Sequence, residues 1–346
     1  MRPIQNTPGE LVTAGRFNLG TFKKPFSKVN PLDVKLLLPL PRAMKSLRLK
    51  EWEHFGLANR DYYISLALFN AKTLALAQVC VYSRKDRKVI FHERKVPGWS
   101  MRLPATVFDS RAEYTARGFE LKIQNALSAG HYLIEFDIAA KKGLPAVKGR
   151  FIFYESSGED QPLVVCLPLG KRAAMYTHKL IGPVEGSLEV AGQVSVFSPG
   201  DAYGLVDVHK GYYPFVMKWH WATGGGRDSR GRLCGFNFTD NQVEDQENYN
   251  ENCIWQDGKI QLLPPVKFAF DPGDHLQPWT VRDSKGRVDL TFQPEVVRTV
   301  DVNALVIRSK YRAPFGAFSG RIRPEEGEEA FVDGFFGMCE NFYLRT

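Results

Sequence analysis

The chain of 346 residues is 44% hydrophobic and carries a net charge of +8 at pH 7. This length allows two domains or one large β-architecture, and the apolar content excludes a disordered chain. The basic residues are scattered and have no aromatic platform beside them, so we expect no nucleic-acid partner. No apolar run approaches the ~20 residues of a membrane helix. We therefore expect no integral membrane segment and a cytoplasmic location, which leaves peripheral membrane contact open.

The cysteines and the missing motifs narrow the class of chemistry. Five cysteines, odd in number and widely spaced among mostly apolar neighbours, indicate reduced core thiols and not a disulfide framework. There is no CxxC pair, no HExxH, no GxSxG and no phosphate-binding glycine motif. We therefore expect neither a metal nor a cofactor.

Residues 1–47 are predicted to form an extended strap, because the closely spaced prolines of VNPLDVKLLLPLPRAM (29–44) preclude a regular helix. From Leu49 onward, segments rich in aromatic and β-branched residues alternate with turn residues. FELKIQ (119–124) and HYLIEFDI (131–138) alternate strictly between apolar and polar residues, which is typical of half-buried antiparallel strands. The chain is therefore expected to be a succession of strands with little helix.

The second half of the chain repeats turn and strand signals of the first half. The segment that begins GSLEVAGQV at Gly186 aligns with the one that begins GAFSGRIRP at Gly316, and the offset of 130 residues also superposes Gly204 on Gly334. Upstream, DYYISLAL, LALAQVCVY and KVIFHERKVPG occur in the same order as VMKWHWAT, RLCGFNFTD and KIQLLPPVKF. Such an order is what a repeated barrel predicts, although two unrelated β-meanders would also look alike.

These signals together predict an all-β fold of two tandem lipocalin-like (calycin) antiparallel barrels. The first barrel is expected to span residues 48–214 and the second residues 215–346. A small barrel of this kind is either filled with side chains or holds one small ligand.

The segment 207–255 departs most from a plain β-scaffold, because it holds three of the six Trp and two of the seven His residues. If FVMKWHW is a strand, its period of two directs Lys218 and His220 to one face and Trp219 and Trp221 to the other. We expect the first of these faces to be the chemical one and the second to be an apolar surface.

A hairpin is predicted next. The stretch GGGRDS (224–229) predicts its turn and RLCGFNF (232–238) its returning strand, which would bring Asn237 near His220. The polar run that follows lacks the spacing and central glycine of an EF-hand loop. We therefore prefer a loop that caps the barrel mouth to a calcium site, with Glu251 and Asn252 directed into the cavity.

The motifs DVHKGYYP, KWHWA, GFNFTDN, NENCIW and LPPVKF resemble a large bacterial family known only as a domain of unknown function, over nearly the whole chain. More distantly, the duplicated β-architecture resembles the double-lipocalin enzymes, which include carotenoid hydratases, tocopherol cyclases and lipocalin-type Diels-Alder cyclases. This second resemblance implies an apolar ligand near the junction of the two barrels. In the hydratases it implies protonation of a carbon–carbon double bond by acid residues beside aromatic ones.

Three residues are candidates for catalysis. Asp207 and His209 lie two apart, so a strand directs both to one face, where the carboxylate can fix the imidazole tautomer. The alternative is a surface pair at a strand end. His220 lies between Trp219 and Trp221, whose ring faces stabilise a developing cation by about 0.5–2 kcal/mol. The alternative is ordinary core packing of the two tryptophans, with His220 hydrogen-bonded inside.

We predict that the protein binds an isoprenoid or fatty-acyl molecule near the barrel junction. It would hydrate, isomerise or cyclise this molecule by cofactor-free acid–base chemistry, or else act as a non-catalytic lipid carrier. His178 and Lys179 offer further basic contacts, although an ordinary strand edge is favoured for them. The residues predicted to contact the ligand are Tyr212, Lys218, Trp219, Trp221, Asn237, Glu251, Asn252 and Trp255.

Overall fold

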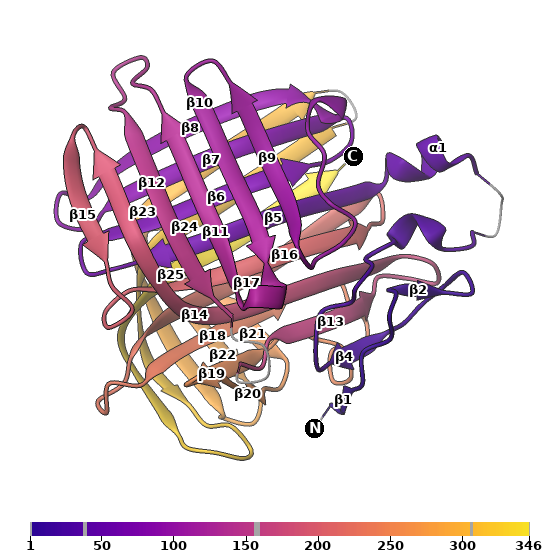
Figure 1. Cartoon of the computed structure of the whole chain (residues 1–346). Helices are drawn as coiled ribbons and strands as arrows, with labels where there is room; N and C mark the ends of the chain where they lie inside the picture. The colour runs from indigo at the N-terminus through magenta and orange to yellow at the C-terminus, as the bar shows by residue number, and fades with distance from the viewer. Residues whose placement is uncertain (1, 37–39, 156–159, 305–306, 346) are drawn as a thin grey trace.

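The computed structural model describes residues 2–36, 40–155, 160–304 and 307–345. Most of these residues belong to β-strands, nearly all of them antiparallel, that form two large curled sheets (Figure 1). The predicted all-β fold of two tandem, duplicated barrel-like units is thereby confirmed. Within the described ranges, no helix is long and apolar enough to cross a membrane.

The first sheet is strongly curved, so that its last strands approach its first ones and enclose a core (Figure 1). Its path runs β8-β7-β6-β5-β16-β14-β12-β11-β10-β9. The strands are β5 (Leu49–Ala58), β6 (Tyr62–Asn70), β7 (Leu74–Ser83), β8 (Lys88–Pro97), β9 (Ser110–Ala116), β10 (Phe119–Ala126), β11 (His131–Ile138), β12 (Val147–Tyr154), β14 (Ala174–Val190) and β16 (Tyr203–Tyr212), with β13 (Leu163–Pro168) and β15 (Gln193–Phe197) paired to β14.

The second sheet repeats this plan with the remaining strands, in the order β20-β19-β18-β17-β25-β24-β23-β22-β21. In both sheets, four consecutive strands pair in sequence, and the last long strand of the unit returns to pair with the first. The strands are β17 (Val216–Arg227), β18 (Leu233–Asp240), β19 (Cys253–Gln256), β20 (Lys259–Leu262), β21 (Val266–Ala269), β22 (Trp279–Asp283), β23 (Val288–Ala304), β24 (Ile307–Ile322) and β25 (Ala330–Arg345).

The strand order equates β5 with β17 and β16 with β25, which confirms that the two halves of the chain are repeats. The alignment of the two halves by sequence, however, is out of register. Gly204 lies level with Leu57, as Gly337 lies level with Gly224. The counterpart of Gly204 is therefore Gly337 and not Gly334. The alignment slipped because Gly334 is skipped in the pairing of β24 with β25, where it forms a β-bulge with a φ of 65°. Two of the three upstream matches are likewise out by one strand, because they equate β6 with β17 and β7 with β18. The third match, of β8 with β20, agrees with the strand order.

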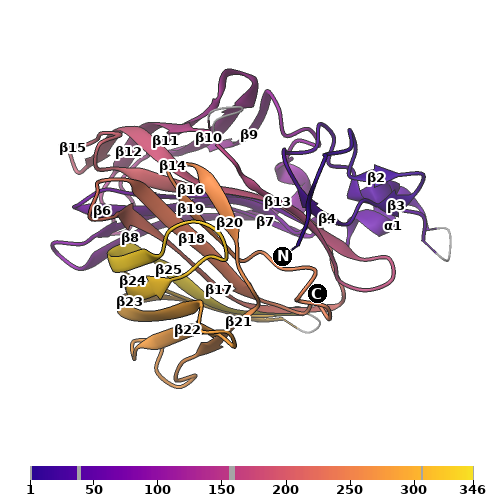
Figure 2. The ribbon, with the colours of Figure 1, turned by 90° about the horizontal axis from the view of Figure 1, so that it is seen from below.

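The N-terminal segment carries the short strands β1 (Ile4–Gln5), β2 (Val12–Thr13), β3 (Arg16–Phe17) and β4 (Gly20–Phe22). It lies beside the sheets, where β4 pairs with β13 (Figure 2). The expectation of no regular helix over 29–44 is wrong at its end, because the short helix α1 (Arg42–Ser46) begins directly after Pro41. A proline there removes no intrahelical hydrogen bond. Residues 37–39 of that stretch lie outside the described residues.

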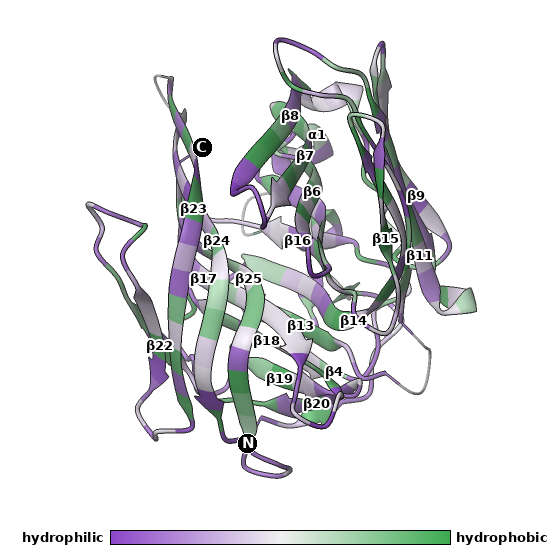
Figure 3. Ribbon diagram, turned by 90° about the vertical axis from the view of Figure 1, so that its left-hand side faces the viewer, coloured by the Kyte–Doolittle hydropathy of each residue, from purple (hydrophilic) through white to green (hydrophobic). Residues whose placement is uncertain are grey.

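The two sheets pack against each other as layers, with β17 and β23–β25 on one side and β6–β8 on the other (Figure 3). Aromatic contacts join the layers, such as Tyr63 with Phe315 at 5.0 Å between ring centroids. The Tyr203 hydroxyl of the first sheet donates to the backbone carbonyl of Phe336 in the second at 2.9 Å. All five cysteines are buried free thiols, as predicted.

The predicted hairpin exists, but its turn follows later than expected, at residues 228–232. The glycine stretch belongs to β17 itself. A Cβ atom at Gly225 would lie 2.8 Å from the Tyr203 ring, and one at Gly226 would lie 2.7 Å from the Phe335 ring. These glycines therefore allow aromatic rings to pack onto the sheet and do not serve the turn.

Candidate active site between the two sheets

A cavity of about 390 Å³ lies between the two sheets. Its walls come from β5–β8, β14 and β16 of the first sheet and from β17, β18 and β23–β25 of the second. The walls are largely apolar and include a small set of charged side chains, which is the usual composition of a small-molecule site. The sequence placed a ligand at the junction of the two units, and this is where the cavity lies.

Lys179 of β14 is at the centre of the charged part of the cavity. Its Nζ lies 3.5 Å from Oδ1 of Asp207 and 3.8 Å from Oε2 of Glu251. The ammonium also lies over the Trp221 ring, 4.7 Å from its centroid. Burial opposes the charge of Lys179, but the neighbouring carboxylates outweigh burial and raise its pKa. The ammonium therefore stays protonated between two nearly buried carboxylates.

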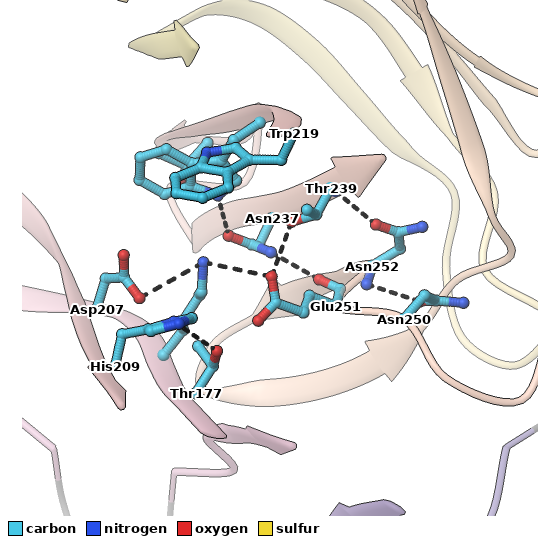
Figure 4. Close-up of polar contacts among 12 residues, drawn as sticks. Thr177, Asp207, His209, Trp219, Asn237, Thr239, Asn250, Glu251 and Asn252 are labelled. Carbon is cyan, nitrogen blue, oxygen red and sulfur yellow. Dashed lines mark hydrogen bonds and ion pairs between the residues drawn. The ribbon is translucent and has the colours of Figure 1, made fainter. Parts of the chain in front are cut away.

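The polar run after the hairpin holds Glu251 in place. Thr239 Oγ1 donates to Glu251 Oε2 at 3.0 Å, and Asn237 Nδ2 donates to the Glu251 backbone carbonyl at 2.6 Å (Figure 4). Asn237 Oδ1 accepts from the Trp221 indole at 2.7 Å, and Asn252 Oδ1 accepts from the Thr239 amide at 2.7 Å. Among the described residues, no group of three His, Cys, Asp or Glu side chains is arranged to hold a metal ion. This polar run therefore supports the cavity wall. Of the two residues predicted to point into the cavity, Glu251 lines it and Asn252 does not.

Two tryptophan–carboxylate pairs face each other across the cavity. Trp52 of β5 donates its indole hydrogen to Oδ2 of Asp207 on β16 at 3.1 Å. Trp219 of β17 donates to Oε2 of Glu340 on β25, also at 3.1 Å. The two indoles stack with their centroids 5.9 Å apart. Because β5 corresponds to β17 and β16 to β25, the two pairs are equivalent by the internal repeat.

Glu340 differs from Asp207 in its electrostatic surroundings. Tyr311 donates a hydrogen bond to its Oε1 at 2.6 Å, and no Lys or Arg pairs with it in the described part of the chain. Burial raises the pKa of Glu340, and the charge of Asp207 adds to this effect. The bonds from Tyr311 and Trp219 and the charge of Lys179 oppose the rise but do not cancel it. Glu340 therefore keeps its proton to a higher pH than an ordinary glutamic acid.

Asp207 and His209 both face the cavity, as the period of two predicted, but they do not hydrogen-bond to each other. The His209 ring stacks on Trp52 with centroids 3.7 Å apart and an interplanar angle of 2°. Its Nδ1 lies 3.0 Å from Thr177 Oγ1, and its Nε2 contacts the Tyr213 hydroxyl. Burial lowers the pKa of His209 well below its usual range, so the imidazole is neutral.

The faces of β17 alternate as predicted, but the face that lines the cavity is the one with Trp219 and Trp221. His220 points to the other side of the sheet, where its ring lies 5.2 Å from that of Phe270, and burial lowers its pKa. Lys218 is exposed and lies outside the cavity. The aromatic surface is thus the side that meets the charged residues.

Three other predicted ligand contacts lie outside the cavity lining, and one of them, Asn237, supports the wall through the bonds described above. Tyr212 is buried beside Arg48, whose guanidinium lies 5.5 Å from the Tyr212 ring centroid. Trp255 is fully buried and donates its indole hydrogen to the Gln161 carbonyl at 2.9 Å. Both residues pack the fold.

Sequence reasoning missed Trp52, Arg298, Tyr311 and Glu340, and it favoured a plain strand edge for Lys179. The internal repeat carried a signal for some of these residues. In the register of the structure, KEWEH aligns Trp52 with Trp219 of MKWHW, and VDVH aligns Asp207 with Glu340 of CENF.

Comparisons with known proteins bear on the fold and on the family of the chain. A crystal structure of CghA with Sch210972 matches with a TM-score of 0.54 at 13% identity, covering 86% of this chain and 88% of that chain. A crystal structure of kievitone hydratase from Nectria haematococca gives a TM-score of 0.49 at 10% identity, with 95% and 98% of the two chains covered. At such identities the likeness to CghA shows the fold alone. No curated protein matches the sequence. The family model described as a domain of unknown function (DUF2804) matches residues 2–345, and the chain therefore belongs to this family, as its motifs predicted.

Proposed function

We propose that the protein binds a largely apolar small molecule in the cavity between its sheets and transfers a proton to a carbon–carbon double bond of that molecule. The observation that carries this proposal is the difference between two equivalent carboxyl groups. Asp207 is paired with the Lys179 ammonium, whereas burial raises the pKa of Glu340. A carboxyl group with a raised pKa beside a carboxylate that is paired with an ammonium can supply an acid and a base to the same molecule.

Glu340 is the general acid in this proposal. Its proton forms a new C–H bond as the π bond breaks, which leaves a positive charge on the adjacent carbon. The resulting carboxylate keeps the hydrogen bonds from Tyr311 and Trp219, which favour the charged form. His209 covers one face of Trp52 and Phe342 lies against Trp219. The cation would meet the remaining ring faces, which stabilise it by about 0.5–2 kcal/mol each.

Asp207 is the base. It takes a proton from a neighbouring carbon, which restores a double bond and gives isomerisation, or from a water molecule that adds to the cation, which gives hydration. Attack of a second double bond on the cation, followed by the same proton loss, gives cyclisation. Exchange with solvent then returns the proton to Glu340, so the reaction needs no external reductant or oxidant.

The sequence suggested Asp207 or His209 as the proton donor, with His220 as a further candidate. Glu340 is the better donor because burial keeps His209 neutral, and both of its ring nitrogens are already engaged by Thr177 and Tyr213. His220 faces away from the cavity. We therefore assign His209 the role of holding the Trp52 ring by stacking.

Deuterium incorporation tests the proposal. The protein is incubated in heavy water with the apolar molecules extracted from it, and with geraniol and oleate as defined probes, and mass spectrometry follows deuterium on carbon. Glu340→Gln should lower the exchange rate by about 10²- to 10⁴-fold. The matched control is Glu185→Gln, since Glu185 accepts a tyrosine hydrogen bond at 2.5 Å outside the cavity lining. Unchanged exchange in Glu340→Gln would refute its role as the acid. Bound ligand without any exchange would identify a carrier.

A further inference from the structure

The guanidinium of Arg298, on β23, lines the same cavity and has no anionic partner among the described residues. One of its terminal nitrogens donates to Oε1 of Gln78 at 2.9 Å. Its Nε is buried without a hydrogen-bond partner in the structure. A guanidinium in an apolar cavity normally has its donors satisfied, because an unsatisfied buried charge is costly. This Nε is closed off from the cavity, and the guanidinium also contacts the Cys80 thiol. A bound molecule would therefore meet the side of Arg298 that lines the cavity, where no carboxylate pairs with it among the described residues.

The neighbours of Arg298 fix its position but do not neutralise it. The guanidinium carbon lies 4.5 Å from the ring centroid of Phe91 and 5.2 Å from that of Tyr311. The nearby carboxylate of Glu93 is engaged elsewhere, since it accepts from Gln78 Nε2 at 2.5 Å and pairs with an exposed lysine, Lys95, at 3.1 Å. Gln78 thus separates Glu93 from Arg298. A guanidinium held between two rings presents its planar fork in one orientation.

We propose that the molecule bound in this cavity is an apolar acid whose carboxylate pairs with Arg298. This inference rests on the proposed function in one respect, namely that the substrate binds in the same cavity. A carboxylate matches the fork of a guanidinium with two parallel hydrogen bonds. It also matches the charge, because one unpaired cation balances one negative charge, whereas a phosphate group would carry nearly two.

The same arrangement says where the reacting carbon lies along the molecule. The Tyr311 ring that packs against Arg298 donates its hydroxyl hydrogen to Glu340 at 2.6 Å. The carboxylate site and the general acid are therefore separated by one tyrosine side chain. A molecule bound at Arg298 presents to Glu340 a carbon several bonds from its carboxylate, and its apolar remainder lies against the walls of the cavity.

Binding measurements test the inference independently of turnover. Dodecanoate and the uncharged dodecanamide are titrated by calorimetry at one pH and ionic strength. The wild type should bind dodecanoate at least about 10-fold more tightly, which corresponds to about 1.4 kcal/mol. Arg298→Gln should remove most of this preference and leave the affinity for the amide within about threefold. Arg94→Gln is the matched control, since Arg94 also lies over a ring, that of Phe119 at 5.1 Å, but outside the cavity.

Several outcomes decide the question. Equal affinity of the wild type for the acid and the amide, or no binding of either at about 1 mM, would overturn the inference, and neither result depends on a variant folding. A preference that survives in Arg298→Gln would assign the carboxylate to another cation. Arg298→Lys should retain part of the preference, because it keeps the charge and loses the fork. A preference for the acid without deuterium exchange would support this inference and contradict the proposed reaction. Deuterium exchange without a preference for the acid would support the reaction and contradict this inference.

Discussion

Asp207 and Glu340 occupy equivalent positions in the two halves of the chain, and each accepts a hydrogen bond from the indole of an equivalent tryptophan at 3.1 Å. The equivalence extends to the backbone, because Asp207 is level with His54 as Glu340 is level with Trp221. The equivalence does not include the strand on the other side, β14, where Lys179 is level with Asp207. On β24, Arg312 pairs with Asn341, so the next residue, Ala313, is level with Glu340 and offers it no charge. The lysine beside Asp207 and the Tyr311 hydroxyl beside Glu340 therefore give the two acids different surroundings.

Removal of this lysine should destabilise the fold. Lys179→Met leaves the side chains of Asp207 and Glu251 buried without their ammonium, and breaking a buried ion pair in this way costs about 3–5 kcal/mol. Urea denaturation measures the change. The control is Lys267→Met, whose pair with Asp240 at 3.0 Å involves a lysine side chain that is 74% exposed, and this should cost at most about 1 kcal/mol. Equal losses in both variants would argue against a central role for Lys179.

The hydrogen bond from Trp219 should set the pH range of activity. Burial raises the pKa of Glu340 and the Trp219 bond holds it down, so Trp219→Phe should raise that pKa further. The high-pH limb of the rate profile, where the acid loses its proton, should then move up by about one pH unit. Trp52→Phe, which removes the bond to Asp207, should leave this limb in place. A limb that stays fixed in Trp219→Phe would assign it to another group.

Glu53 should make stability depend on pH. Burial raises its pKa from the usual 4.5 to about 7, with Lys210 opposing and Glu51 adding to the effect. Below pH about 4.5 the folded and unfolded chains are both protonated here, and between about 4.5 and 7 only the unfolded chain releases the proton. Stability should therefore fall over this range, by about 3 kcal/mol from this group. Glu53→Gln should show a shallower decline in urea unfolding from pH 4 to 8, and parallel curves would contradict the shift.

Close approach of two strands at Gly337 should make that position intolerant of any side chain. A Cβ there would lie 2.0 Å from the Thr223 carbonyl oxygen, a backbone atom that moves only with its strand. We expect Gly337→Ala to lower the free energy of unfolding by more than about 2 kcal/mol. Gly200→Ala is the control, because nothing lies within 4 Å of its Cβ position, and it should change stability by less than about 1 kcal/mol.

The fold was predictable where strands have one buried and one exposed face. β10 and β11 alternate in burial as their sequences alternate in polarity. The register of the repeat was not predictable in the same way. Gly334 lies in a bulge and Gly204 lies in a regular strand, but the sequence does not distinguish the two kinds of glycine. An alignment that matches them is therefore shifted.

The site was predictable only in part, for a related physical reason. β16 is buried on both faces along its whole length and β14 along its first half, so polarity does not indicate which side a residue faces. The sequence identified Asp207 and Trp219 because they stand in an unusual segment. Glu340 and Arg298 stand in ordinary strands, and only the pairing of distant strands brings them to the same cavity.

The covalent joining of the two halves has a consequence for how such a cavity can evolve. Two identical subunits assembled around a twofold axis would present the same carboxyl group twice, with the same neighbours and the same affinity for a proton. In this chain the two copies can mutate separately, so a lysine beside Asp207 has no counterpart beside Glu340. Fusion of a duplicated unit thereby allows a nearly symmetric scaffold to give its two sides opposite chemical tasks.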